Sequence, residues 1–200
     1  MHKSGKLITY RQIGIRGRTG NGSASFISTK LSREMYMRRK EREIVDKNEI
    51  IDFINSRYVG ILSVMSDDGP YAIPLNYFYD DGCIYVHSAM NGKKIDSIKK
   101  DNRVCFLVYA DGPQILHEKA CGISQIYKSV ICFGNIEIVS DFDSKKDILI
   151  RMVSKFVPEE YHYSSMKDEN INSTNIMKIR IKKMTGKENK LSSNHTVIDR

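Results

Sequence analysis

The sequence predicts a mainly β protein: a small β-barrel, closed or split, with six to seven mostly antiparallel strands and about three peripheral helices. Short β-branched and apolar runs recur along the chain, separated by turn sequences such as 66–70 and 80–82. Helical periodicity is confined to a few segments. The runs also lack the strand–helix–strand alternation of a doubly wound parallel sheet, which excludes a dinucleotide-binding fold of that kind.

The expected elements follow in chain order. A helix begins after Asp46, whose carboxylate can cap its first turn, and two more helices cover 93–100 and 143–156. Pro74 interrupts one strand and predicts a sheet edge or a bulge there. Loops are expected over 110–119 and 158–174, with a loose tail from 187. The expected strands are 59–65, 71–79, 83–88, 103–109, 121–127, 129–139 and 175–184, the last at a sheet edge.

The net charge of +8 is concentrated at the start of the chain. Residues 1–40 hold ten basic residues and one acid, whereas residues 41–200 hold 22 basic and 23 acidic residues. A neutral body argues against a nucleic-acid-binding domain. We divide the chain into a flexible basic leader at 1–36, a domain at 37–189 and a tail at 190–200. The leader is expected to lie outside the functional domain, with an anion-binding arm and a transit peptide as alternatives.

The sequence predicts a cytoplasmic protein. No stretch approaches the roughly 20 apolar residues that a membrane-spanning helix needs, and no secretory signal opens the chain. The four cysteines (Cys83, Cys105, Cys121 and Cys132) lie in or beside strand-like runs without metal-ligand spacing. They are expected to be buried free thiols, and no metal site is expected.

The segment 84–94 is the strongest candidate for chemistry. A strand ends at His87 and Ser88, a short loop contains Gly92, and a helix begins with Lys93 and Lys94. Free N–H groups at a helix start, a hydroxyl and two ammonium groups together favour a bound phosphate. A helix start with solvated lysines is the plainer alternative.

The segment 74–77 is the second candidate. Pro74 leaves main-chain pairing groups free, Asn76 can donate and accept hydrogen bonds, and Tyr77 could stack on a planar heterocycle. The alternative is an edge strand protected against aggregation. The segment 127–130 by itself indicates only the start of a strand. No hydrolase motif is present.

Several segments occur in an order that resembles a known family. They are 38–44, 60–63, 70–77, 84–89, 92–94, 102–106, 127–130, 133–134 and 185–187. Between about 37 and 189 the chain resembles the pyridoxamine 5′-phosphate oxidase-related FMN-binding proteins, in the branch of the NimA-like 5-nitroimidazole-resistance proteins. The leader has no counterpart in that family.

The resemblance implies an FMN-binding split β-barrel and a homodimer with FMN at its interface. It implies a substrate-facing, catalytic role for His87. The implied cofactor-binding residues fall into three groups. His87, Ser88, Ala89, Gly92, Lys93 and Lys94 would surround the phosphate; Pro74, Leu75, Asn76 and Tyr77 would lie along the isoalloxazine ring; Ser129 and Val130 would line the cofactor or the interface.

These implications lead to a functional hypothesis. The protein is expected to be an FMN-dependent oxidoreductase that passes electrons from NAD(P)H or a reductase to a small planar acceptor such as a nitroaromatic. The sequence lacks the arginine-rich phosphate pattern of the oxidases proper, which argues against vitamin B6 oxidation. The alternative is a non-enzymatic flavin or haem carrier or sensor on the same barrel. Neither a nucleic-acid nor a membrane partner is expected.

Overall fold

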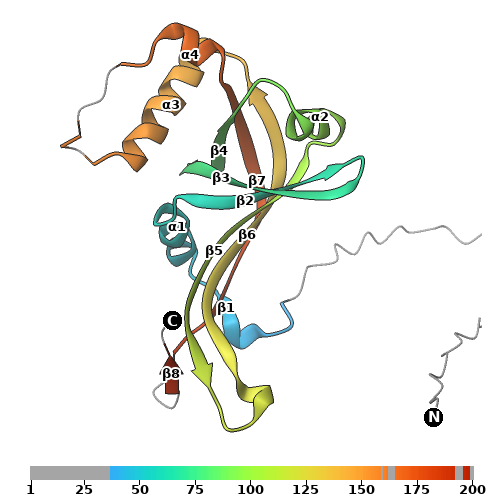
Figure 1. The fold of residues 1–200 in the computed structure, drawn as a ribbon, viewed down its shortest axis with the longest axis vertical. Helices are drawn as coiled ribbons and strands as arrows, with labels where there is room; N and C mark the ends of the chain where they lie inside the picture. Colours follow the sequence, from blue (N-terminus) through green and yellow to red (C-terminus); the bar gives the residue numbers. More distant parts are fainter. Residues whose placement is uncertain (1–36, 159, 162–164, 192–195, 199–200) are drawn as a thin grey trace, which may run out of the picture. The chain divides into compact units, whose positions relative to one another are not determined.

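The computed structural model describes residues 37–158, 160–161, 165–191 and 196–198 (Figure 1). The predicted leader therefore lies outside the described residues. The helices are α1 (Lys47–Asn55), α2 (Lys93–Lys100), α3 (Phe142–Phe156) and α4 (Asp168–Asn172). The strands are β1 (Glu43–Ile44), β2 (Val59–Ser66), β3 (Gly69–Asp80), β4 (Cys83–Ser88), β5 (Arg103–Leu116), β6 (Ser124–Val139), β7 (Asn175–Asn189) and β8 (Thr196–Ile198).

The strands form one antiparallel sheet that closes on itself. They pair in the order β1-β7-β4-β3-β2-β5-β6, and β6 also pairs with β7. β8 pairs with β5 outside this path. The predicted mainly β class, a barrel with peripheral helices, is confirmed.

Local sequence explains why two of these elements form. The Asp46 carboxylate accepts a hydrogen bond from the Asn48 main-chain N–H at 2.8 Å and caps α1. Between β3 and β4, Asp81 and Gly82 both have positive φ, at 40° and 72°. Two left-handed residues make the tight hairpin turn whose twist matches the flanking strands. This turn places Asp80 opposite Cys83 and sets the register of both strands.

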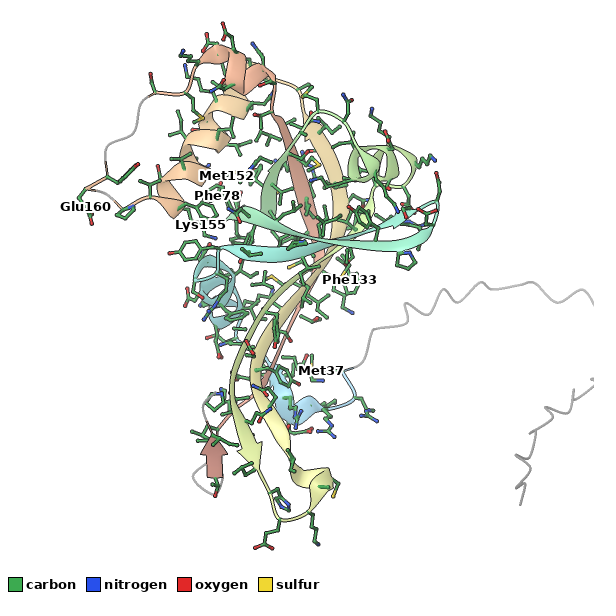
Figure 2. The ribbon with its side chains drawn as sticks, viewed as in Figure 1. Met37, Phe78, Phe133, Met152, Lys155 and Glu160 are labelled. Carbon is green, nitrogen blue, oxygen red and sulfur yellow. The ribbon has the colours of Figure 1, made fainter. Side chains whose placement is uncertain are left out.

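The main core fills the inside of the barrel. Its fully buried side chains include Leu62, Tyr77, Ile84 and Phe106 from four neighbouring strands. The apolar faces of α1 and α2 join this core, through residues such as Ile54. A second cluster lies on the outside of the barrel, where α3 covers β3, β4, β6 and β7. Figure 2 shows Met152 of α3 close to Phe78 of β3 in this outer cluster.

The structure departs from the predicted elements in the second half of the chain. The loop predicted at 110–119 is largely strand, because β5 continues past Gly112 and Pro113 with a register shift between Asp111 and Gln114. One continuous strand, β6, takes the place of the two strands predicted at 121–127 and 129–139. β7 is not an edge strand, since it pairs with β4 on one side and β6 on the other. It also runs to Asn189, and β8 lies in the segment predicted as a loose tail.

The edge predicted at Pro74 is confirmed. β3 pairs with β2 from Gly69 to Asn76 but with β4 only from Tyr77 onward. The proline therefore lies where β3 has one neighbour, and its missing N–H removes no ladder hydrogen bond on the open side.

Two further expectations concern thiols and membranes. Cys132 is buried and Cys83 and Cys105 are half-buried, but Cys121 is exposed, so the expected burial fails there. Cys121 belongs to a short 3-10 turn between β5 and β6, where no layer covers it. Within the described parts of the chain, no helix is long and apolar enough to cross a membrane.

Candidate functional site

The outward side of β3 carries a flat row of small side chains. Ala72, Pro74 and Asn76 are exposed, because alternate residues of a strand point to opposite faces. Leu75 and Tyr77 point the other way, into the core. Since few atoms stand above this row, a planar molecule can approach the main chain of β3 closely.

Tyr77 is a core residue rather than a stacking residue. Its side chain is fully buried, its ring meets the Phe106 ring edge-on, and its hydroxyl donates to the Ile54 carbonyl at 2.5 Å. Burial raises the pKa of Tyr77, so the hydroxyl stays protonated. The predicted stacking by Tyr77 is therefore wrong, because the ring is fully buried, with Phe106 at its edge and the Lys155 ammonium of α3 4.2 Å from its centre.

His87 lies beside this row, on the neighbouring strand. Tyr77 pairs with Val86, which places Asn76 next to His87 on the outward face. Both residues line a mainly apolar pocket of about 300 Å³ under the edge of α3. Its other lining residues are Leu149, Met152, Val153, Phe156, Val157 and Thr174. One imidazole and one amide are thus the polar groups of β3 and β4 in an otherwise largely hydrophobic cavity.

The pKa of His87 is lowered from its usual value. Partial burial is the main cause, and the positive charge of Lys94 adds to it. The imidazole is therefore mostly neutral at pH 7, with one N–H to donate and one nitrogen to accept.

The turn from β4 into α2 forms a corner with free N–H groups. Asn175, itself buried, donates to the Ala89 and Met90 carbonyls at 3.1 Å each and holds the loop against β7. Gly92 has φ +126°, a conformation that favours glycine, and its carbonyl accepts the first helical hydrogen bond, from Ile95, at 2.8 Å. We call Ser88, Gly92, Lys93 and Lys94 the α2 corner.

The two lysines of the α2 corner differ in their partners. Lys93 forms an ion pair with Asp68 at 2.7 Å. Lys94 is half-buried, and none of the described acidic residues pairs with it; burial lowers its pKa. Within the described chain, the main-chain N–H groups of both lysines also lack an acceptor. An anion at this corner would satisfy these groups.

The structure separates Ser129 from Val130. Val130 pairs with Val108 and is fully buried, so its side chain belongs to the core rather than to a cofactor site. Ser129 faces outward and donates to the Lys187 carbonyl at 3.3 Å.

Ser129 shares its face of the sheet with Pro74. The register runs from Pro74 through Ile61 and Leu107 to Ile131, and Ser129 is the next outward residue of β6. Three strand spacings put Ile131 about 14 Å from Pro74. Ser129 therefore does not touch the row on β3 within one chain.

This outward face is apolar and bare. Val59, Met65 and Tyr109 are 50%, 53% and 50% exposed on it. Its half-buried members are Ile61, Leu107, Ile131 and Phe133. None of the described helices covers it, because α1 and α2 pack into the main core and α3 packs on the outer cluster. Figure 2 shows Phe133 well away from α3. His87 and Asn76 thus lie where the cover of α3 ends and the bare face begins.

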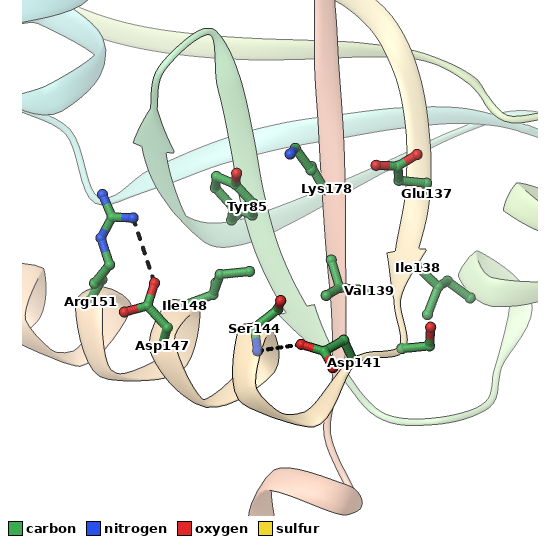
Figure 3. Close-up of a pocket in the computed structure, with 11 residues that line it drawn as sticks. Tyr85, Glu137, Ile138, Val139, Asp141, Ser144, Asp147, Ile148, Arg151 and Lys178 are labelled. Carbon is green, nitrogen blue, oxygen red and sulfur yellow. Dashed lines mark hydrogen bonds and ion pairs between the residues drawn. The ribbon is translucent and has the colours of Figure 1, made fainter.

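A second cavity, of about 420 Å³, lies between α3 and the ends of β6 and β7 (Figure 3). Its charged groups are mostly engaged: Arg151 pairs with Asp80 at 2.9 Å, and Glu137 pairs with Arg180 at 2.8 Å. None of the site residues predicted from the sequence lines it.

Sequence reasoning missed Ala72, Asn175 and the α3 side of the pocket. Alternation along β3 could have indicated Ala72, since it is two residues from Pro74 on the same face. Asn175 and the α3 residues gave no signal, because their position beside His87 depends on contacts between distant segments.

Comparisons with solved structures agree with this fold. A structure of a candidate 5-nitroimidazole antibiotic resistance protein from Bacteroides thetaiotaomicron is 26% identical, with a TM-score of 0.63 over 73% of this chain and 86% of that one. A FAD-binding protein from Mesorhizobium loti is 25% identical, with a TM-score of 0.54 over 74% and 95%. The flavocytochrome Anf3 from Azotobacter vinelandii shares the fold, with a TM-score of 0.74 over 84% and 77% at 16% identity.

A search of curated proteins found no match. The sequence profile of the pyridoxamine 5′-phosphate oxidase family, however, matches residues 46–188, which is more than half of the chain. The match includes β2–β7, which carry the row on β3, His87 and the α2 corner. The resemblance read from the ordered segments is confirmed: the chain belongs to the pyridoxamine 5′-phosphate oxidase family.

Proposed function

We propose that this protein binds FMN and is an oxidoreductase that reduces a small planar acceptor, such as a nitroaromatic. One observation carries the proposal. A corner suited to a phosphate, a flat row suited to a planar ring and a neutral histidine at a pocket all meet at one border of the barrel. Membership of the pyridoxamine 5′-phosphate oxidase family, whose resemblance implies bound FMN, supports this interpretation of the arrangement.

The residues at the α2 corner fit a phosphate monoester. Lys94 would supply a full charge, Ser88 a hydroxyl, and the main-chain N–H groups after Gly92 directed hydrogen bonds. Lys94 lacks an acidic partner within the described chain. A phosphate dianion would therefore stabilise its partly desolvated ammonium without competing with a carboxylate for it.

The row of Ala72, Pro74 and Asn76 fits the edge of a planar ring. Small side chains permit close approach, and Asn76 can both donate and accept at the ring edge. FMN, when bound, supplies the electron transfer, while the protein binds and orients it.

His87 would act on the acceptor rather than on the cofactor's phosphate alone. Its side chain lines a mainly apolar pocket of about 300 Å³, large enough for a small planar molecule. In such a place a neutral imidazole can donate a hydrogen bond to an acceptor oxygen. It can also pass a proton to the acceptor as this is reduced, provided that its other nitrogen takes up a proton from solvent. The similarity to a candidate nitroimidazole resistance protein supports a nitroaromatic as this acceptor.

The bare face of the sheet supports a homodimer. A contiguous apolar face of this kind marks an interaction surface. We propose that a second copy covers it, with FMN between the two chains, and that Ser129 lines that shared interface. NADH, NADPH or a reductase would supply the electrons. The proposal places the protein in the cytoplasm, where the four free cysteines stay reduced.

The test begins with the visible spectrum of the purified protein and the chromatographic identity of any released cofactor. Lys94→Ala should weaken FMN binding at least about tenfold, because it removes a partly desolvated charge. Lys99→Ala, on the same helix but away from the corner, is the matched control. A colourless wild-type protein that does not bind added FMN would refute the proposal.

Turnover separates an enzyme from a carrier. The oxidation of NADH or NADPH, measured directly or through a reductase, should accelerate when a nitroaromatic is added. His87→Ala should slow this step while FMN stays bound. Bound FMN without turnover would favour the alternative of a non-enzymatic flavin carrier, and a haem spectrum would favour a haem binder on the same fold.

A further inference from the structure

The turn between β2 and β3 holds α2 through two ion pairs. Lys93 reaches Asp68 at 2.7 Å, and Lys100, two helical turns later, reaches Asp67 at 2.5 Å. The Lys93 ammonium also lies 4.9 Å from the centre of the Tyr71 ring on β3. Adjacent aspartates on one turn thus engage two lysines on one face of the helix.

Only one of these ion pairs lies at the α2 corner. Lys93 is the first residue of α2, next to the free N–H groups, whereas Lys100 is the last residue of the helix. The hydrogen bond between Lys93 and Asp68 lowers the pKa of Asp68 and raises that of Lys93, so both are charged at neutral pH. Asp68 therefore brings a negative charge beside the place where the phosphate would bind.

We propose that Asp68 sets the affinity of the α2 corner for phosphate-bearing ligands by holding Lys93 in an ion pair that the phosphate must break. This inference rests on the proposed function. A phosphate and the Asp68 carboxylate compete for one flexible ammonium, and they repel each other across it. No described carboxylate competes with the phosphate for Lys94, which supplies the basal affinity. Asp68 weakens phosphate binding at the α2 corner, so it lowers the affinity for FMN but not for a flavin without the phosphate.

The experiment compares Asp68→Asn with Asp67→Asn in the full chain. Both variants remove one negative charge from the same turn, and both break an exposed ion pair of small value to stability, so both should fold. Flavin fluorescence measures the binding of FMN and of riboflavin, which lacks the phosphate. We expect Asp68→Asn to bind FMN about threefold to tenfold more tightly at low ionic strength and riboflavin as the wild type does. Asp67→Asn should bind FMN within about twofold of the wild type, and added salt should shrink the difference.

The outcomes separate this inference from the proposed function. If the wild type binds FMN and Lys94→Ala loses it, but Asp68→Asn binds no more tightly, only the role of Asp68 is overturned. Equal tightening by Asp67→Asn, or equal tightening for riboflavin, also overturns it, because a general charge effect would then explain the gain. If the wild type binds no FMN, or Lys94→Ala binds it unchanged, the phosphate site itself is wrong and both proposals fail.

Discussion

Replacing Tyr77 by phenylalanine tests whether this residue belongs to the core or to the cofactor site. The change removes only the hydroxyl that donates to the Ile54 carbonyl at 2.5 Å in a fully buried setting. A typical intramolecular hydrogen bond contributes about 1 kcal/mol, and leaving its buried acceptor unpaired adds to the loss. The Ile54 carbonyl keeps the Arg57 main-chain N–H at 3.3 Å, so the added penalty is small. We therefore expect the free energy of unfolding to fall by about 1.5 kcal/mol.

Thermal and urea unfolding of the flavin-free protein measure this loss, which corresponds to a fall in Tm of about 3–6 °C. Tyr85→Phe is the matched control, because the described structure gives its half-buried hydroxyl no hydrogen bond. It should cost less than about 0.5 kcal/mol. FMN affinity and the flavin spectrum should not change in Tyr77→Phe. Equal stability of the two variants, or a changed flavin spectrum in Tyr77→Phe alone, would contradict the placement of Tyr77.

Three other predictions follow. Gly134→Ala should destabilise the protein by about 3 kcal/mol in urea unfolding, because its Cβ would overlap the Arg180 main-chain carbonyl on β7. Burial lowers the pKa of His87 in the folded protein below its unfolded value of 6.5. The contribution of the neutral imidazole to the free energy of unfolding is therefore complete above pH 6.5 and is lost as the pH falls through the folded pKa. His87→Gln should make the fall in Tm on acidification smaller. Asp46→Ala should cost about 1 kcal/mol by removing the cap of α1, measured by urea unfolding.

The error over Tyr77 arose from treating 74–77 as one unit instead of counting its faces. At odd positions β3 has Tyr71, Ile73, Leu75 and Tyr77, all large and apolar; at even positions it has Ala72, Pro74 and Asn76. A period of two assigns the first set to the core and the second to the surface. The sequence therefore contained enough information to place Tyr77 correctly.

The position of His87 beside Asn76 could also have been predicted from the sequence. A two-residue turn at Asp81 and Gly82 sets Asp80 opposite Cys83, and counting back along both strands brings the two residues together. The boundaries of β4 and α2 were predicted correctly for the same reason, since glycines and a clear change of period mark them.

The elements that could not be predicted depend on partners far along the chain. β5 continues through Gly112 and Pro113 because β6 pairs with it on both sides of the register shift, which overrides local turn signals. β7 alternates imperfectly and so resembles an edge strand, yet both of its sides are paired. The pocket wall from α3 likewise depends on a helix about 60 residues after His87 packing back over β4.

The position of β7 has a consequence for synthesis of the chain. β4 and β6 each leave one side without a partner until Asn175–Asn189 has been made, because β7 closes the barrel between them. A nascent chain that stops before this segment therefore exposes one edge each of β4 and β6, with free main-chain donors and acceptors, to other chains. Closure by a late strand also demands contacts of large sequence separation, which slows folding. Mutations or pauses that delay β7 should thus reduce the yield of folded protein even where they leave the finished barrel intact.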